Sequence, residues 1–104
     1  MLKKIIALCL LCTSAHSETQ MVNDAKINWF RTHTDKASVK YTTFKVDKAL
    51  QNNCLEIVIP LGDNTAESHA LAAKAQSAIV QVHYSNDQPL PFNGACWLIA
   101  LTSK

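Results

Sequence analysis

The sequence contains few of the residues from which catalytic and phosphate-binding sites are commonly built. Gly62 and Gly94 are its only glycines, which excludes a glycine-rich phosphate-binding loop. His33, His69 and His83 are not spaced like zinc ligands, either from one another or from a cysteine. The carboxylates are scattered, and no serine stands in a nucleophile elbow or a readable triad. We therefore expect no catalytic residue, no metal and no cofactor, and a protein that is not an enzyme.

A long hydrophobic run is also missing. The uncharged stretch over residues 5–15 has eleven residues, whereas a membrane-spanning helix needs about 20. It follows two lysines and ends in small residues, which is the pattern of a secretory signal over residues 1–17, cleaved before Glu18. A lipoprotein signal is the alternative, but Cys9 and Cys12 both follow a bulky leucine. The pattern predicts a periplasmic or secreted protein without a stable membrane anchor.

Once the predicted signal is removed, the chain lacks an excess of charge of either sign. Residues 18–104 keep eight of the ten basic residues, because two lie in the signal, and all eight acidic residues. Within them, residues 26–48 hold six basic residues against only Asp35 and Asp47. Such a segment is either a solvated face or a surface that meets anions. Nucleic-acid-binding domains tend to be basic throughout, so no nucleic-acid partner is expected.

Cysteine is scarce as well, because only two of the four cysteines lie outside the predicted signal. Cys54 and Cys96 each begin an apolar segment, and the exported chain offers them no other partner. We predict that they form an intramolecular disulfide, with a reactive thiol pair or a bond between chains as the alternatives. A covalent link suits one small domain over residues 18–104, since small domains bury a modest share of their surface.

The remaining residues fall into five apolar or β-branched segments and one alanine-rich segment. Residues 18–25 are polar and are expected to form a frayed end or a short helical turn. Asn64 and Glu67 can form a capping box at the start of a helix that ends near Gln76. Trp29 and Phe30 are adjacent, so large apolar side chains point to both faces of one strand. A curled strand with a bulge would explain this arrangement. Strands are expected at residues 26–34, 38–46, 54–59, 78–84 and 96–102.

The order of these elements is that of an OB-fold, although other small α+β sheets present the same order of elements. The sequence predicts a mainly β, α+β domain built as a five-stranded, OB-fold-like Greek-key barrel, with the helix between strands three and four. The segment 54–59 is almost wholly apolar and is expected to be a central strand covered on both faces.

The unit from Cys54 to Cys96 resembles small secreted proteins of marine and enteric bacteria. In these, a cysteine-bounded strand leads to a helix that ends like Leu71-Ala72-Ala73-Lys74-Ala75, and then to a strand like the one holding Tyr84-Ser85. Their layout is similar to the B subunits of bacterial A–B toxins of the cholera, Shiga and subtilase-cytotoxin types. The resemblance implies a disulfide-stapled OB-fold that binds glycans as a homo-oligomer of five copies beside a secreted catalytic subunit. This chain lacks the glycine that follows the helix in that family.

Candidate binding residues follow from the OB-fold expectation. Ligands of OB-folds meet the face of strands two and three and the loops between strands one and two and between strands four and five. A tryptophan on a strand is either a core residue or a flat surface on which a sugar ring packs. Trp29 shares a strand face with Arg31 and is the better candidate for such a surface. Trp97 lies beside Cys96 and is expected in the core. The predicted ligand-binding residues are Trp29, Arg31, Asp35, Lys36, Lys40, Tyr41, Asn86, Asp87 and Asn93.

Two functions are compatible with these observations. The first is a secreted binding module for a glycan or another polar ligand, for which the lysines favour an anionic ligand such as a sialylated glycan. The second is a periplasmic interaction protein, such as an inhibitor or accessory subunit of an envelope enzyme.

Overall fold

The structure is a computed structural model that describes residues 19–33, 36–37 and 41–104. The predicted signal over residues 1–17 lies outside the described residues, and so do Asp35 and Lys40 of the predicted binding residues. No helix among the described residues is long and apolar enough to span a membrane.

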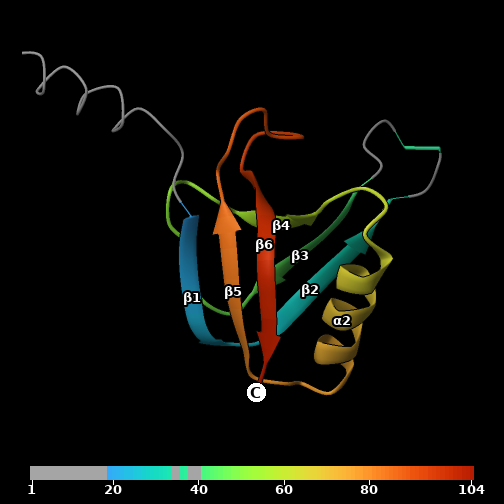
Figure 1. Cartoon of the computed structure of the whole chain (residues 1–104), viewed down its shortest axis with the longest axis vertical. Helices are drawn as coiled ribbons and strands as arrows, with labels where there is room; N and C mark the ends of the chain where they lie inside the picture. The colour runs from blue at the N-terminus through green and yellow to red at the C-terminus, as the bar shows by residue number, and fades with distance from the viewer. Residues whose placement is uncertain (1–18, 34–35, 38–40) are drawn as a thin grey trace, which may run out of the picture.

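One sheet of six strands and one helix make up the described part of the chain (Figure 1). The strands lie in the order β1-β5-β6-β4-β3-β2, and all neighbours are antiparallel except the parallel pair β4 and β6. The fold is therefore mainly β with one helix. In chain order the elements are β1 (Thr19–Ala25), β2 (Ile27–Thr32), β3 (Thr42–Val46), β4 (Glu56–Ile59), α2 (Asn64–Ala75), β5 (Val80–Ser85) and β6 (Ala95–Ser103).

The prediction of a five-stranded barrel is wrong, since the sheet is open and has six strands. The additional strand is β1, in the segment that was expected to be a frayed end or a short helical turn. As an edge strand it pairs only with β5 and turns few side chains to the core, Val22 and Ala25 among them, so its sequence shows no strong apolar pattern. Lys26 alone separates β1 from β2, although these strands lie at opposite ends of the strand order.

Two local predictions about the strands are confirmed. The pairing of β2 with β3 shifts register between Ile27 and Trp29, which is the expected bulge. The third predicted strand is central: β4 lies between β3 and β6, and Ile57, Val58 and Ile59 are all buried. Because side chains of a strand alternate between its two faces, both faces of β4 are covered.

Helix α2 is capped by a different residue from the one predicted. The Asp63 carboxylate accepts a hydrogen bond from the backbone N–H of Ala66 at 3.0 Å, so the expected capping box of Asn64 and Glu67 is not formed. The helix lies against the sheet through Ala70 and Ala73, whereas the side chain of Leu71 is 52% exposed. Small side chains on the packed face allow this close approach.

The end of α2 explains the missing glycine. Ser77 adopts a left-handed backbone conformation with φ of 51°. The backbone N–H of Ala78 donates to the carbonyl of Ala73 at 2.9 Å, and that of Ser77 donates to the carbonyl of Lys74 at 3.1 Å. These are the two hydrogen bonds of a Schellman motif, in which glycine usually takes the position of Ser77.

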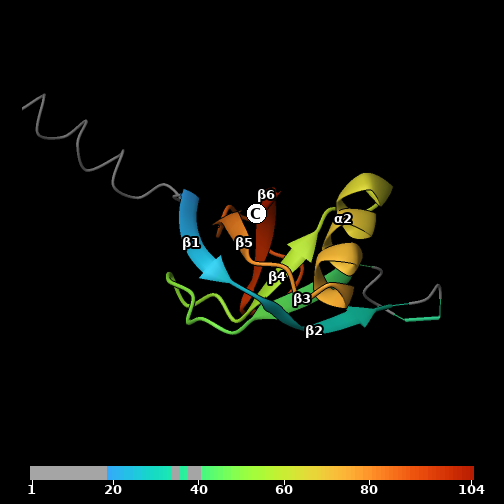
Figure 2. The same cartoon turned by 90° about the horizontal axis from the view of Figure 1, so that it is seen from below.

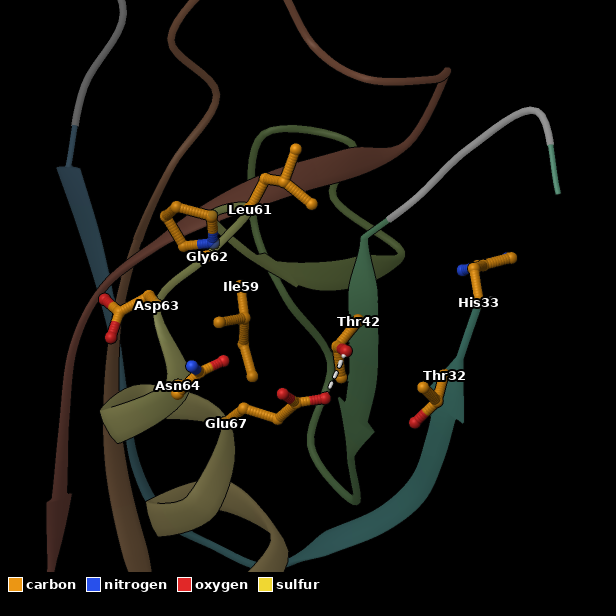
Figure 3. A pocket seen from close by; sticks show the side chains of 10 residues that line it. Thr32, His33, Thr42, Ile59, Leu61, Gly62, Asp63, Asn64 and Glu67 are labelled. Carbon is orange, nitrogen blue, oxygen red and sulfur yellow. Dashed lines mark hydrogen bonds between the residues drawn. The ribbon is translucent and has the colours of Figure 1, made fainter. Parts of the chain in front are cut away.

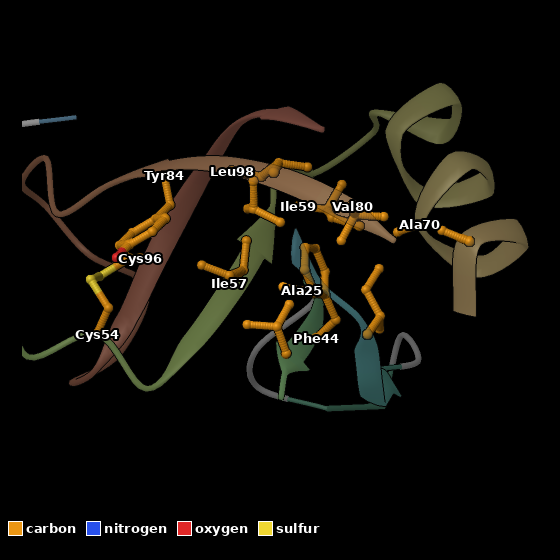
Figure 4. Packing of buried hydrophobic residues seen from close by; sticks show 14 residues of the cluster. Ala25, Phe44, Cys54, Ile57, Ile59, Ala70, Val80, Tyr84, Cys96 and Leu98 are labelled. Atoms are coloured by element: carbon orange, nitrogen blue, oxygen red, sulfur yellow. A yellow bond between two sulfur atoms is a disulfide. The ribbon is translucent and has the colours of Figure 1, made fainter. Parts of the chain in front are cut away.

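The core lies on the concave side of the curled sheet. Leu98 and Val80 from the β5–β6 half point toward Phe44, Ile57 and Ile59 from the other half (Figure 4). Both views of the fold place α2 on the side of the molecule away from β1 (Figure 2). A contact of 2.7 Å between His69 Nε2 and Ser103 Oγ joins α2 to the end of β6.

The predicted disulfide is present at one end of this core. Cys54 and Cys96 are bonded, with their Cα atoms 5.7 Å apart, and both are buried. They connect the residues just before β4 to the start of β6. A buried structural disulfide of this kind is typical of proteins that fold outside the reducing cytoplasm.

Candidate functional site

The convex face of the sheet, opposite the core, carries a row of paired residues across four strands. Arg31 of β2 pairs with Thr43 of β3, Thr43 pairs with Val58 of β4, and Val58 pairs with Trp97 of β6. Directly paired residues point to the same side of a sheet, so these four side chains form one row. Thr43 and Val58 in the middle of the row are fully buried.

At the β2 end of the row, two cations lie against one tryptophan. The guanidinium carbon of Arg31 is 4.6 Å from the centroid of the Trp29 ring, and Nζ of Lys45 is 4.7 Å from it. Trp29 pairs directly with Lys45 across the β2–β3 ladder, and Arg31 follows two residues later on the same face. Both distances are within the range of a cation–π interaction, so the Trp29 ring contacts two positive charges.

At the other end of the row, two aromatic rings meet. Tyr41 and Trp97 contact each other edge to face, with ring centroids 5.6 Å apart. The indole N–H of Trp97 lies 3.1 Å from the carbonyl oxygen of Asp87 and 3.3 Å from that of Pro89, and donates to both. The loop between β5 and β6 is thus fastened to the edge of Trp97, which fixes the orientation of this ring beside Tyr41.

The two ends together form a surface that we name the outer-face cluster, consisting of Trp29, Arg31, Tyr41, Lys45 and Trp97. The aromatic members are half-buried and Arg31 is exposed. Among the described residues, neither Arg31 nor Lys45 forms an ion pair with a carboxylate. The cluster therefore combines polarisable rings with cations whose charge is not neutralised by an ion pair.

Two polar oxygens are buried on the same outer face. Thr43 Oγ1 and Glu56 Oε1 have no hydrogen-bond partner within the part of the chain that the structure describes. Glu56 precedes Val58 by two residues on β4 and so belongs to the outer face with Thr43. Most buried polar atoms in proteins are paired, which makes these two oxygens unusual features of this surface.

The structure brings together part of the predicted binding set. Trp29 lies against Arg31, and Tyr41 is connected to the backbone of Asp87 through Trp97. Lys36 and Asn93 are exposed and Asn86 is half-buried, while Asp35 and Lys40 lie outside the described residues.

Sequence reasoning missed two members of the cluster. Trp97 was expected in the core but lies half-buried on the outer face, because β6 turns its neighbours Cys96 and Leu98 inward. Strict alternation along 96–98 would have indicated this. Lys45 is brought to Trp29 by the bulge-shifted register of β2 and β3, for which the sequence alone gives no signal.

A pocket, separate from the outer-face cluster, lies on the core side of the same strands. This pocket of about 420 Å³ opens where β2 ends, β3 begins and α2 starts (Figure 3). The hydroxyl of Thr42 donates to Oε2 of Glu67 at 2.6 Å across this pocket. The His33 Nδ1 atom lies 2.6 Å from the carbonyl oxygen of Tyr41. Since a carbonyl can only accept, Nδ1 carries a proton and donates.

In the described segments, no group of three or more histidine, cysteine, aspartate or glutamate side chains is arranged to hold a metal ion. Comparison with known proteins adds no assignment, because no protein-family model, no curated protein and no solved structure matches this chain.

Proposed function

We propose that this protein is a secreted, non-enzymatic binding module that recognises an acidic glycan on the outer-face cluster. The observation that carries the proposal is the pair of cations, Arg31 and Lys45, held at Trp29 without a carboxylate partner in the described chain, in one surface with the Tyr41–Trp97 ring pair.

The chemistry of the cluster suits a sugar with a negative group. The apolar face of a pyranose ring packs on aromatic side chains, and its hydroxyls hydrogen-bond to polar groups around them. Arg31 and Lys45 would bind a carboxylate or sulfate on the same ligand through charge-assisted hydrogen bonds. Trp29 limits the freedom of both cations before binding, which reduces the entropy lost when the ligand binds.

An OB-fold-like topology fits this proposal. If β1 and β2 are the two halves of one long strand interrupted at Lys26, the chain has five strands and the helix lies between the third and fourth. In that numbering β3 and β4 are strands two and three, whose face OB-folds use for ligands. Residues Thr43 and Val58 of the outer-face row belong to these two strands.

A periplasmic or secreted location and self-association are further parts of the proposal. The disulfide fits an oxidising compartment. The described sheet ends in two edge strands, β1 and β2, and Leu61 and Ile99 are exposed, which supports burial of such surfaces in a homo-oligomer. We expect five copies, from the resemblance to toxin B subunits. A monomer mass measured by light scattering at micromolar concentration would contradict this expectation.

The binding proposal is tested by applying residues 18–104 to an array of neutral and acidic glycans. Retention of acidic glycans above background, and weaker retention at high salt, is the expected result, because salt screens exposed charges. A signal restricted to neutral glycans would contradict the role of the cations, and no signal on any glycan would contradict glycan binding.

A further inference from the structure

The pocket between α2 and the ends of β2 and β3 is separate from the outer-face cluster. Its floor is a row of paired residues, Thr32, Thr42 and Ile59, on the core side of the sheet. The loop that follows β4 forms one rim, and the first turn of α2 supplies Glu67. At this end of the sheet, the apolar side chains of the core give way to two threonines.

Glu67 is the charged group that reaches into this pocket. Figure 3 shows its carboxylate directed from α2 toward Thr42 and Thr32. Oε2 accepts the Thr42 hydroxyl at 2.6 Å, and the structure gives Oε1 no hydrogen-bond partner among the described residues. Asp63 also lines the pocket, but its carboxylate is turned to the backbone N–H of Ala66. The pocket therefore holds one half-buried carboxylate with unused acceptor capacity.

The lining residues exclude several kinds of ligand. The described residues that line the pocket include no lysine and no arginine, so an anion would find neither of these counter-charges among them. The same described lining residues include no tryptophan, tyrosine or phenylalanine on which a sugar ring could stack. A divalent metal needs several converging ligands, and no such group exists in the segments that the structure describes.

What remains is a donor-rich cation with an apolar stem. A primary ammonium group has three N–H donors and no acceptor. The Glu67 carboxylate and, on the floor of the pocket, the hydroxyl oxygens of Thr32 and Thr42 offer three acceptor groups. Ile59 and Pro60 supply apolar lining for a methylene chain. We propose that this pocket is a binding site for an alkylammonium group, carried by a free alkylamine or by a lysine side chain of a partner protein.

The site is tested by titrating isotopically labelled protein, residues 18–104, with two probes and following amide shifts by NMR. Butylamine represents a free amine, and Nα-acetyl-lysine N-methylamide represents a lysine side chain. The uncharged norleucine derivative has the same backbone and nearly the same length without the ammonium. We expect either amine to bind and to shift amide signals centred on Thr32, Thr42 and Glu67. Tighter binding of the lysine derivative would assign the site to a lysine of a protein partner. Equal or tighter binding of butylamine would assign it to free amines.

Glu67→Gln is the decisive variant, because glutamine can still accept from Thr42 but has no charge. It should weaken amine binding by about tenfold or more, since hydrogen bonds to charged groups are the stronger ones. Asp63→Asn is the matched control: it removes the same charge from the lining and retains a helix-capping side chain, so it should weaken binding less than about threefold. Melting curves of both variants verify that they are folded. Three results would overturn the proposal. They are norleucine-derivative binding as tight as that of the lysine derivative, amine affinity unchanged in Glu67→Gln, and no binding of either amine at tens of millimolar.

Discussion

Removing the disulfide should cost this domain a large part of its stability. Cys54 and Cys96 are 42 residues apart in sequence. In the chain-entropy treatment, a cross-link that closes a loop of this length restricts the unfolded chain by about 4 kcal/mol. The whole stability of a small domain is about 5–15 kcal/mol, so one bond accounts for a substantial share of it.

The position of the bond makes this cost difficult to recover elsewhere. The disulfide supports the parallel pairing of β4 with β6, which is short and has α2 and β5 between its strands in sequence. Bringing together strands so distant in sequence requires closing a long loop, and the cross-link removes this requirement from folding. Both cysteines are buried, so removing the sulfur atoms also reduces packing in the core.

The perturbation is the double variant Cys54→Ala/Cys96→Ala, compared with the oxidised protein in urea unfolding followed by circular dichroism. We expect a loss of about 3–5 kcal/mol and a melting temperature lower by more than about ten degrees. The dependence of the unfolding free energy on urea should also become steeper, because an unfolded chain without a cross-link exposes more surface. A loss below about 1 kcal/mol would refute the stabilising role, and an unchanged urea dependence would refute its entropic origin.

Two further changes test the local structure through thermal and urea unfolding. Tyr84→Phe should destabilise the fold by about 1–2 kcal/mol, because the buried Tyr84 hydroxyl accepts the backbone N–H of Gln51 at 2.8 Å; an unchanged midpoint would show that this N–H finds another acceptor. Ser77→Gly should stabilise it by about 0.5–1 kcal/mol, since glycine adopts the positive φ found here without the steric cost that serine incurs; a lower melting temperature would argue against the left-handed helix end.

The sequence indicates the elements better than it indicates the edges of the sheet. The central strand β4 is readable because Ile57, Val58 and Ile59 form a continuous apolar run, as a strand covered on both faces requires. The edge strand β1 is not readable, because pairing on one side and a few buried side chains suffice to hold it. Because the sequence does not reveal β1, it could not distinguish the open six-stranded sheet from a five-stranded barrel.

For the candidate site, spacing along one strand is predictable and register between strands is not. Trp29 and Arg31 are two residues apart on β2, so their shared face follows from the sequence. Lys45 reaches the same ring only because of the shifted register of β2 and β3. The capping expectation failed for a related reason: Glu67 is drawn to Thr42, a residue 25 positions earlier, rather than to the helix end.

The most direct test of the central claim is isothermal titration of residues 18–104 with the acidic glycan that the array retains best. The double variant Arg31→Gln/Lys45→Gln is compared with Lys74→Gln, which removes a positive charge from α2, away from the outer-face cluster. Loss of at least about tenfold in affinity for the double variant, with Lys74→Gln binding like the unchanged protein, is the predicted result. Equal affinity of all three proteins for the glycan would contradict binding at the outer-face cluster.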